Sequence, residues 1–240
     1  RRQRQMCIRD RFSGGLDSTT CLYWALQRFR AVTAVSFRYG QRHSSELDCA
    51  SRLAKNLQKQ YPLTHRIIDI DIGGLGGSAL TDSTLSVPTH DSANQYDERT
   101  NNVPSTYVPA RNTIFLSYAL AVAEVSHACH IVIGVSSVDY SGYPDCRPDY
   151  IHAFQTLANL ATVAGRQGNT LVIDAPLQTL SKADTLRLGI SLGVDYSQTV
   201  SCYQADSQGR ACGVCDSCHL RRQGFIEAGI ADPTRYQPTY

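Results

Sequence analysis

The chain has 240 residues, with 23 basic and 21 acidic side chains and a formal net charge of +2. This balance argues against a protein whose main task is to grip a nucleic-acid backbone. No apolar run approaches the ~20 residues that span a bilayer. No signal-peptide pattern is present, so we expect a cytoplasmic location without direct contact to nucleic acid or membrane. The length suits one large α/β domain and a small appendage.

The amino-terminal segment, residues 1–11, contains five arginines and only scattered apolar positions. A strand that is buried between helices normally reads as a continuous apolar run, and this segment does not. Met6 is the only methionine of the chain. We therefore predict that residues 1–11 are a non-native or truncated segment that does not supply the first strand of the sheet.

The next feature is a glycine loop, Ser13-Gly14-Gly15-Leu16-Asp17-Ser18, which runs directly into a helical pattern at residues 18–29. Paired glycines let the backbone turn tightly and approach a ligand. The following helix directs its free N–H groups and positive dipole end at the loop, which makes a cradle for pyrophosphate. Asp17 is suited to hold Mg²⁺ on phosphate oxygens. The alternative is a glycine-rich turn capped by serine and aspartate.

Strands and helices alternate along the rest of the chain. β-Branched runs predict strands at 31–37, 67–72, 131–135 and 171–173. Apolar spacing predicts helices at 44–60, 113–128, 149–165 and 181–191. This alternation predicts a doubly wound parallel sheet with helices on both faces. The long polar stretches 73–106 and 136–148 would emerge near the carboxyl ends of strands, where ligands bind in such sheets.

Two polar blocks follow predicted strands. The first carries Tyr39, Gln41 and His43, and its alternative interpretation is a polar turn with a glycine. The second, residues 134–147, mixes aromatic rings with carboxylates and an arginine, which suits a flat heterocycle. Asp139 or Asp145 is suited to coordinate a metal or to bond a purine-like edge there. The alternative for this block is a surface turn held by tyrosine packing.

Two basic residues stand at predicted helix starts. Arg111 precedes an apolar helix that Asn112 is suited to cap, and it is a candidate clamp for phosphate or carboxylate. Lys182 lies in the first turn of its helix, where the dipole disfavours a cation, so an anion beside it would explain its place. The alternatives are a solvated arginine and a lysine that extends to solvent.

Nine cysteines are present, and an odd, scattered count argues against a disulfide framework. Cys202, Cys212, Cys215 and Cys218 cluster with the spacing of a structural zinc site. An iron–sulfur cluster is the main alternative, although Arg222 stands where the ferredoxin run has its next cysteine. A redox dithiol is a further alternative.

The loop resembles the PP-loop of ATP pyrophosphatases, whose signature is Ser-Gly-Gly-x-Asp-Ser. Four further blocks are Tyr-Gly-Gln-Arg-His, Val-Pro-Ala-Arg-Asn, Asp-Tyr-Ser-Gly-Tyr-Pro-Asp-Cys-Arg and Cys-Gly-x-Cys-x-x-Cys. With them, the chain resembles the 7-cyano-7-deazaguanine synthase (QueC) family from Phe12 to about Tyr236. The resemblance implies an adenine nucleotide alpha hydrolase-like PP-loop domain over 12–200 and a zinc-binding segment over 201–240. The missing first strand is the departure from the family.

The resemblance also implies an activity and a set of site residues. ATP would adenylylate 7-carboxy-7-deazaguanine, and ammonium would supply the nitrogen. The product would be 7-cyano-7-deazaguanine, which is used to make queuosine in tRNA. The enzyme would be a homodimer that uses Mg²⁺ with ATP and holds structural Zn²⁺. Catalytic roles fall on Asp17, Lys182 and Arg111. ATP binding falls on Phe12, Ser13, Gly14, Gly15, Leu16, Asp17, Ser18, Thr19, Thr20, Cys21 and Leu22. Substrate binding falls on Tyr39, Gln41, His43, Asp139, Tyr143, Asp145 and Arg147, and metal binding on the four clustered cysteines.

Two other functions remain open at this point. One is another PP-loop enzyme, such as a tRNA thiolation or lysidine-forming enzyme, which would need an RNA-binding surface that the balanced charge does not favour. The other is a zinc-containing interaction module without catalysis, which would not turn over ATP.

Overall fold

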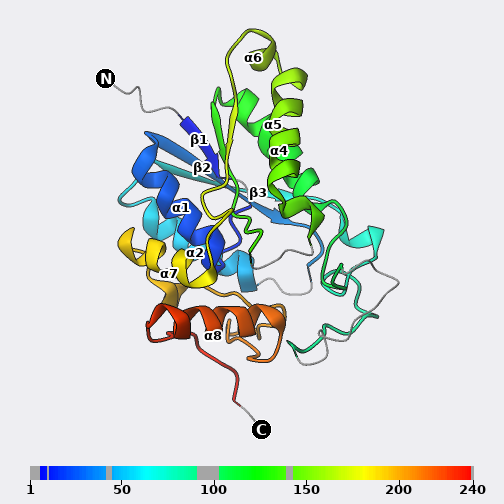
Figure 1. Cartoon of the computed structure of the whole chain (residues 1–240), viewed down its shortest axis with the longest axis vertical. Helices are drawn as coiled ribbons and strands as arrows, with labels where there is room; N and C mark the ends of the chain where they lie inside the picture. The colour runs from blue at the N-terminus through cyan, green and yellow to red at the C-terminus, as the bar shows by residue number, and fades with distance from the viewer. Residues whose placement is uncertain (1–5, 10, 42–44, 91–102, 139–142, 239–240) are drawn as a thin grey trace.

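The computed structural model describes residues 6–9, 11–41, 45–90, 103–138 and 143–238. A parallel five-stranded sheet lies at its centre, in the order β3-β2-β1-β4-β5 (Figure 1). Its strands are β1 (Met6–Arg9), β2 (Ala31–Arg38), β3 (Leu63–Asp69), β4 (His130–Val132) and β5 (Val172–Asp174). This order places the crossover between β1 and β4, so ligands are expected at the carboxyl ends of these strands.

Helices cover both faces of the sheet. One face packs against α1 (Leu16–Arg28) and α2 (Ser45–Leu57), and the other against α4 (Arg111–Val125) and α5 (Pro148–Ala161). Strand residues alternate between the two cores, as pleated geometry requires: Cys7 and Ala34 join the first, Ile8 and Val35 the second. The doubly wound fold predicted from the alternation of elements is thus confirmed.

Two more helices extend the first face. α7 (Lys182–Ser191) packs on α1, and α8 (Asp216–Ala228) packs on α7. Figure 1 shows α8 beside α7, at the end of the molecule opposite the short helix α6 (Val163–Arg166). Single turns lie at η1 (Gly73–Leu75), η3 (Pro144–Cys146) and η4 (Tyr196–Gln198). Among the described residues, no helix is both long and apolar enough to cross a membrane.

The amino-terminal segment departs from its prediction. β1 is the central strand and pairs with β2 on one side and β4 on the other. Cys7 and Ile8 are fully buried, one on each face. The prediction that this segment does not supply the first strand is wrong, because a strand of four residues needs only these two apolar side chains to face the helices. The native or truncated origin of residues 1–11 stays a prediction.

The other elements differ from prediction mainly at their ends. β3 starts at Leu63 instead of 67, and the predicted helix 149–165 breaks at Thr162, whose hydroxyl accepts a hydrogen bond from the Gly165 N–H and starts α6. The capping box at Ser181 is confirmed. α8 was not predicted, because the side it buries includes Arg221 and Gly224 as well as apolar residues.

Candidate functional site

A cavity opens where β1, β2 and β4 end, as the strand order leads one to expect. The segments after these strands form its wall, together with the first turns of α1, α2, α4 and α7. The carboxyl-terminal segment closes one side. The residues lining it are Arg11, Phe12, Ser13, Gly15, Leu16, Asp17, Ser18, Phe37, Tyr39, Gln41, Glu46, Leu47, Leu80, Arg111, Asn112, Gly134, Val135, Ser136, Tyr143, Cys146, Lys182, Ser201, Tyr203, Ser217 and Arg221.

The glycine loop has the shape that its sequence predicts. Gly14 adopts φ +79°, and a Cβ there would lie 2.7 Å from the Ala50 backbone nitrogen, so only glycine fits against α2. α1 begins two residues later, and its first N–H groups lack carbonyl partners within the helix. The Ser13 and Ser18 hydroxyls are hydrogen-bonded at 3.2 Å beside the cavity. This arrangement is an anion cradle at a helix start.

The predicted ATP-binding stretch divides into two groups. Phe12, Ser13, Gly15, Leu16, Asp17 and Ser18 line the cavity. Gly14, Thr19, Thr20, Cys21 and Leu22 are buried and do not line it. Thr20, for example, bonds Tyr196 across the α1–η4 contact at 2.8 Å, and Cys21 and Leu22 pack in the core. The second group supports the loop from behind.

Asp17 and Lys182 meet at the cavity wall. The Lys182 Nζ donates to both carboxylate oxygens of Asp17, at 2.9 and 3.0 Å. Lys182 is only 7% exposed, and it starts α7, whereas Asp17 is in the first turn of α1. The anion expected beside this lysine is therefore a carboxylate of the chain itself. The pair places one cation and one candidate Mg²⁺ ligand at the loop.

Arg111 lines the cavity at the start of α4, which covers the other face of the sheet from α1. Its Nη1 donates to the Tyr39 hydroxyl at 3.4 Å, and its buried Nε has no hydrogen-bond partner in the described part of the chain. A buried guanidinium with an unused Nε donor is suited to clamp a carboxylate or phosphate. Asn112 does not cap this helix as predicted, because the helix already starts at Arg111. Instead, Asp145 Oδ2 accepts from the Asn112 N–H at 3.1 Å.

Glu46 is a second carboxyl group on the cavity wall, in the first turn of α2. Burial raises its pKa to about 7, although the nearby Arg11 and Arg111 guanidinium groups act to lower it. A carboxyl group with such a pKa can both take up and release a proton near neutral pH.

The predicted substrate-binding residues are only partly brought together. Tyr39, Gln41 and Tyr143 line the cavity. The Gln41 amide is engaged with backbone at both ends, accepting from Tyr39 N–H at 2.8 Å and donating to Phe37 C=O at 3.2 Å. Asp145 is buried behind the wall and Arg147 is exposed at the start of α5. His43 and Asp139 lie outside the described residues, and all these assignments stay predictions.

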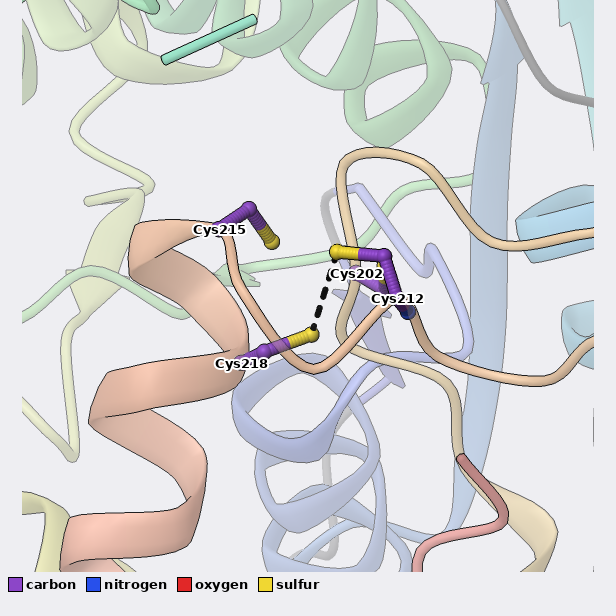
Figure 2. A group of neighbouring side chains, drawn as sticks. All are labelled: Cys202, Cys212, Cys215 and Cys218. Carbon is purple, nitrogen blue, oxygen red and sulfur yellow. Dashed lines mark hydrogen bonds between the residues drawn. The ribbon is translucent and has the colours of Figure 1, made fainter. Parts of the chain in front are cut away.

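The four clustered cysteines form a candidate metal centre (Figure 2). Their Sγ atoms all lie within 4.8 Å of one another, and those of Cys212 and Cys218 are 3.9 Å apart. Thiolates at about 2.3 Å around a tetrahedral ion would be about 3.8 Å apart, so this donor set fits one ion. The backbone N–H groups of Gln204 and Cys212 donate to Cys202 Sγ at 3.3 and 3.2 Å. Such bonds stabilise a thiolate.

Several cavity residues escaped the sequence analysis, notably Arg11, Glu46, Ser201 and Arg221. Two signals were available in the sequence. Glu46 closes the polar block that follows the second strand. Ser201 is adjacent to Cys202, and Arg221 follows Cys218 by three residues, which is nearly one helical turn.

Comparisons with known proteins identify relatives over most of the chain. The family model described as "Queuosine biosynthesis protein QueC" matches residues 10–229. A 7-cyano-7-deazaguanine synthase from Psychrobacter sp. (strain PRwf-1) is 66% identical over 229 residues, covering 93% of this chain and 88% of the relative. The synthase from Acinetobacter baylyi is 62% identical, covering 94% and 93%. The synthase from Pseudomonas savastanoi pv. phaseolicola is 56% identical, covering 93% of both chains.

Proposed function

The chain belongs to the QueC family of queuosine biosynthesis proteins, and on this premise we propose that it is an ATP-dependent carbon–nitrogen ligase that makes 7-cyano-7-deazaguanine. Its substrates would be 7-carboxy-7-deazaguanine, ammonium and ATP. The observation that carries the proposal is the glycine loop at the start of α1, which opens on a cavity with the paired Asp17 and Lys182. This is the arrangement needed to hold a pyrophosphate leaving group.

The chemistry begins with activation of a poor leaving group. A carboxylate oxygen attacks the α-phosphorus of ATP, pyrophosphate leaves, and the substrate becomes an acyl adenylate. Ammonia then displaces AMP and forms the amide. The amide oxygen is adenylylated in turn, and loss of AMP and a proton gives the nitrile. No side-chain nucleophile is needed, so catalysis rests on positioning and electrostatics.

The loop side of the cavity would bind the triphosphate. Amide groups of the loop and the Lys182 ammonium would stabilise charge on the departing pyrophosphate. Mg²⁺ bound with the nucleotide would neutralise phosphate oxygens. Asp17, which faces the cavity, is the residue we propose to hold it.

The α4 side of the cavity would bind the deazaguanine. The Arg111 guanidinium, with its unused Nε donor, would clamp the substrate carboxylate, and the rings of Tyr39 and Tyr143 would pack on the heterocycle. Glu46 would take the proton that ammonium must lose before it attacks. Its place on the wall and its raised pKa support this role.

The four-cysteine centre would hold structural zinc and stabilise the segment 201–240 against the domain 12–200. Its four thiol donors, their cysteine spacing and their mutual distances support zinc over an iron–sulfur cluster. Elemental analysis of the purified protein tests this: one zinc per chain, without the visible absorbance of a cluster, is expected. Iron with inorganic sulfide would overturn it.

A homodimer is also proposed, through the exposed apolar side chains near α5 and α6. Leu160 is 63% exposed and Val163 is 65% exposed. The Val163 N–H donates to Glu124 Oε1, which joins this patch to the end of α4. Light scattering after gel filtration should give twice the chain mass, and Leu160→Glu should give a monomer. A monomeric wild type would exclude the dimer.

One incubation tests the activity. The protein is mixed with ATP, ammonium and 7-carboxy-7-deazaguanine, and the products are identified by mass spectrometry. AMP and the nitrile are expected, and Asp17→Ala should lower the rate about a hundredfold or more with metal content unchanged. Asp48→Ala, on the exposed side of α2, is the matched control. Absence of AMP or of the nitrile from the wild-type reaction would remove the proposal.

The alternative is another PP-loop enzyme that acts on tRNA. Such an enzyme would bind tRNA at physiological salt through a basic surface. A gel shift with tRNA separates the two, because the proposed synthase should give none.

A further inference from the structure

The carboxyl-terminal segment contacts the glycine loop directly. The Val200 N–H donates to Gly14 C=O at 3.1 Å, and the Leu16 N–H donates to Ser201 Oγ at 2.9 Å. Ser201 precedes the first cysteine of the metal centre, and a Cβ on Gly15 would lie 3.3 Å from its hydroxyl oxygen. The loop therefore rests on residues 200–201 as closely as on α2.

Behind Ser201 lies a buried cation, Arg221 of α8, which is 1% exposed and reaches the cavity wall. Its Nη1 donates to Ser201 Oγ at 3.3 Å and to Thr199 Oγ1 at 2.9 Å. Nη2 donates to Tyr196 C=O at 2.9 Å, and Nε donates to Thr234 Oγ1 at 2.6 Å. All four acceptors are neutral.

Among the residues that the structure describes, no carboxylate forms an ion pair with Arg221. Asp232 is close enough to favour the charged form, but burial is the larger effect and lowers the pKa of Arg221. A buried charge without a paired counterion is costly, and neutral side chains could make the same hydrogen bonds at lower cost. An anion that binds close by would offset the cost of this buried guanidinium charge.

The balance of charge at this end of the cavity points to the same conclusion. Lys182 is already matched by Asp17 at 2.9 Å. Arg221 makes no direct ion pair among the described residues, and Asp232 is linked to it through Thr234, whose hydroxyl accepts from Arg221 Nε and donates to Asp232 Oδ1. α8 also shapes the lysine: a Cβ on Gly224 would lie 2.4 Å from Lys182 Cγ, so the lysine stem runs directly over this glycine. Arg221 and Gly224 are three positions apart, so the same side of α8 carries one cation, Arg221, and contacts the other, Lys182.

We propose that Arg221 and Ser201 complete the pyrophosphate-binding site, so that the metal-bearing segment is part of the catalytic apparatus. Ser201 is a positioning residue that fixes the Leu16 amide at the loop–helix junction. Arg221 orients Ser201 and supplies a buried positive charge toward the pyrophosphate. This inference rests on the proposed function for the identity of the anion.

The rival explanation is purely structural. Arg221 would only tie Tyr196, Thr199 and Thr234 together, or offset the negative charge of the metal–thiolate centre near Cys218. In that case its removal would lower stability or metal content, and the folded, metal-loaded variant would bind anions as well as wild type.

Binding of inorganic pyrophosphate to the full, metal-loaded chain, measured by calorimetry, separates the two. Ser201→Ala should raise the Kd for pyrophosphate about three- to tenfold, and Ser201→Thr, which keeps the hydroxyl, should restore it. Arg221→Met should raise the Kd about tenfold or more, and Arg221→Lys, which keeps the charge, should raise it less. Binding of adenosine, which has no phosphate, should not change in any variant. Arg222→Met is the control, because this neighbour is exposed and stacks on Tyr236 instead.

Unchanged pyrophosphate affinity in Ser201→Ala and in the arginine variants, with metal retained, would overturn the inference. So would a wild type that does not bind pyrophosphate. If Arg221→Met does not fold, Ser201→Ala and Arg221→Lys decide, because each leaves most of the surrounding contacts in place. The carboxylated deazaguanine is absent from this assay, so its outcome is separate from product formation, which tests the proposed function.

Discussion

The glycine loop and the four-cysteine segment reach the same cavity by different means. The loop conformation is encoded by neighbours in sequence, namely a glycine at φ +79°, a second glycine and a helix that starts at once, and the loop then packs against α2 and residues 200–201. The cysteine segment gets its place from contacts across the chain, such as the Leu16–Ser201 hydrogen bond between residues 185 positions apart. The comparison teaches that one binding site can combine a locally encoded half with a half that only the tertiary fold assembles.

The largest expected effect comes from breaking the cysteine half. Cys215→Ser removes one of four thiol ligands, so metal content should fall from about one per chain to near zero. The free energy of unfolding should drop by about 3 kcal/mol or more, because the segment has little core of its own. Elemental analysis and chemical denaturation measure both. Cys129→Ser is the control, since this free cysteine lies outside the cluster. Full metal retention in Cys215→Ser would show that the ligands are misassigned.

The two halves also differ in how far the sequence predicted them. The loop, the Asp17 and Lys182 positions and the cysteine ligands were predicted because their patterns are short and their spacing is fixed by turn and helix geometry. Glu46, Ser201 and Arg221 were missed because their nearness to the polar block and to the cysteines does not show that they face the cavity, which depends on tertiary contacts. The central strand β1 was missed for a related reason: Cys7 and Ile8 suffice once β2 and β4 supply the hydrogen bonds on both sides.

The next effect comes from breaking the loop half. Gly14→Ala forces a left-handed backbone and drives a Cβ to 2.7 Å from the Ala50 nitrogen. Gly168→Ala carries a similar φ, +84°, but meets nothing within 4 Å. We expect about 1 kcal/mol of destabilisation in the control from backbone strain alone, and about 1–3 kcal/mol more in Gly14→Ala. Pyrophosphate release should fall about a hundredfold in Gly14→Ala while metal content is unchanged.

Equal losses of stability in these two variants would mean that the loop does not depend on close packing against α2. Loss of metal in Gly14→Ala would mean that the two halves fold as one unit. Only the loss of metal would remove the contrast between a local and an assembled half, because equal losses of stability would mean that the loop is shaped by its own sequence alone.

A smaller effect is expected where the halves touch. Alanine for glycine inside a helix normally stabilises by about 0.5–1 kcal/mol, but a Cβ at position 224 would lie 2.4 Å from Lys182 Cγ. The lysine stem must move, which separates Nζ from Asp17. Gly224→Ala should therefore lower kcat about tenfold with metal retained. Gln223→Ala, exposed on the same helix, should behave as wild type. A fully active Gly224→Ala variant would show that the α7–α8 contact does not determine the position of the Lys182 side chain.

The last effect is a pH dependence of stability that comes from Glu46 on α2. Glu46 has its pKa raised from 4.5 to about 7 by burial, so the native state binds this proton more tightly than the unfolded state does. The stability it contributes is complete below pH about 4.5 and is lost as the pH rises toward about 7. Relative to Glu46→Gln, the wild type should lose about 1–3 kcal/mol of unfolding free energy over that interval. Urea denaturation at several pH values measures it, with Asp48→Asn on the exposed side of α2 as the control. If the difference in unfolding free energy between wild type and Glu46→Gln does not change over this pH range, Glu46 is solvated. That result would also exclude Glu46 as the acceptor of the ammonium proton.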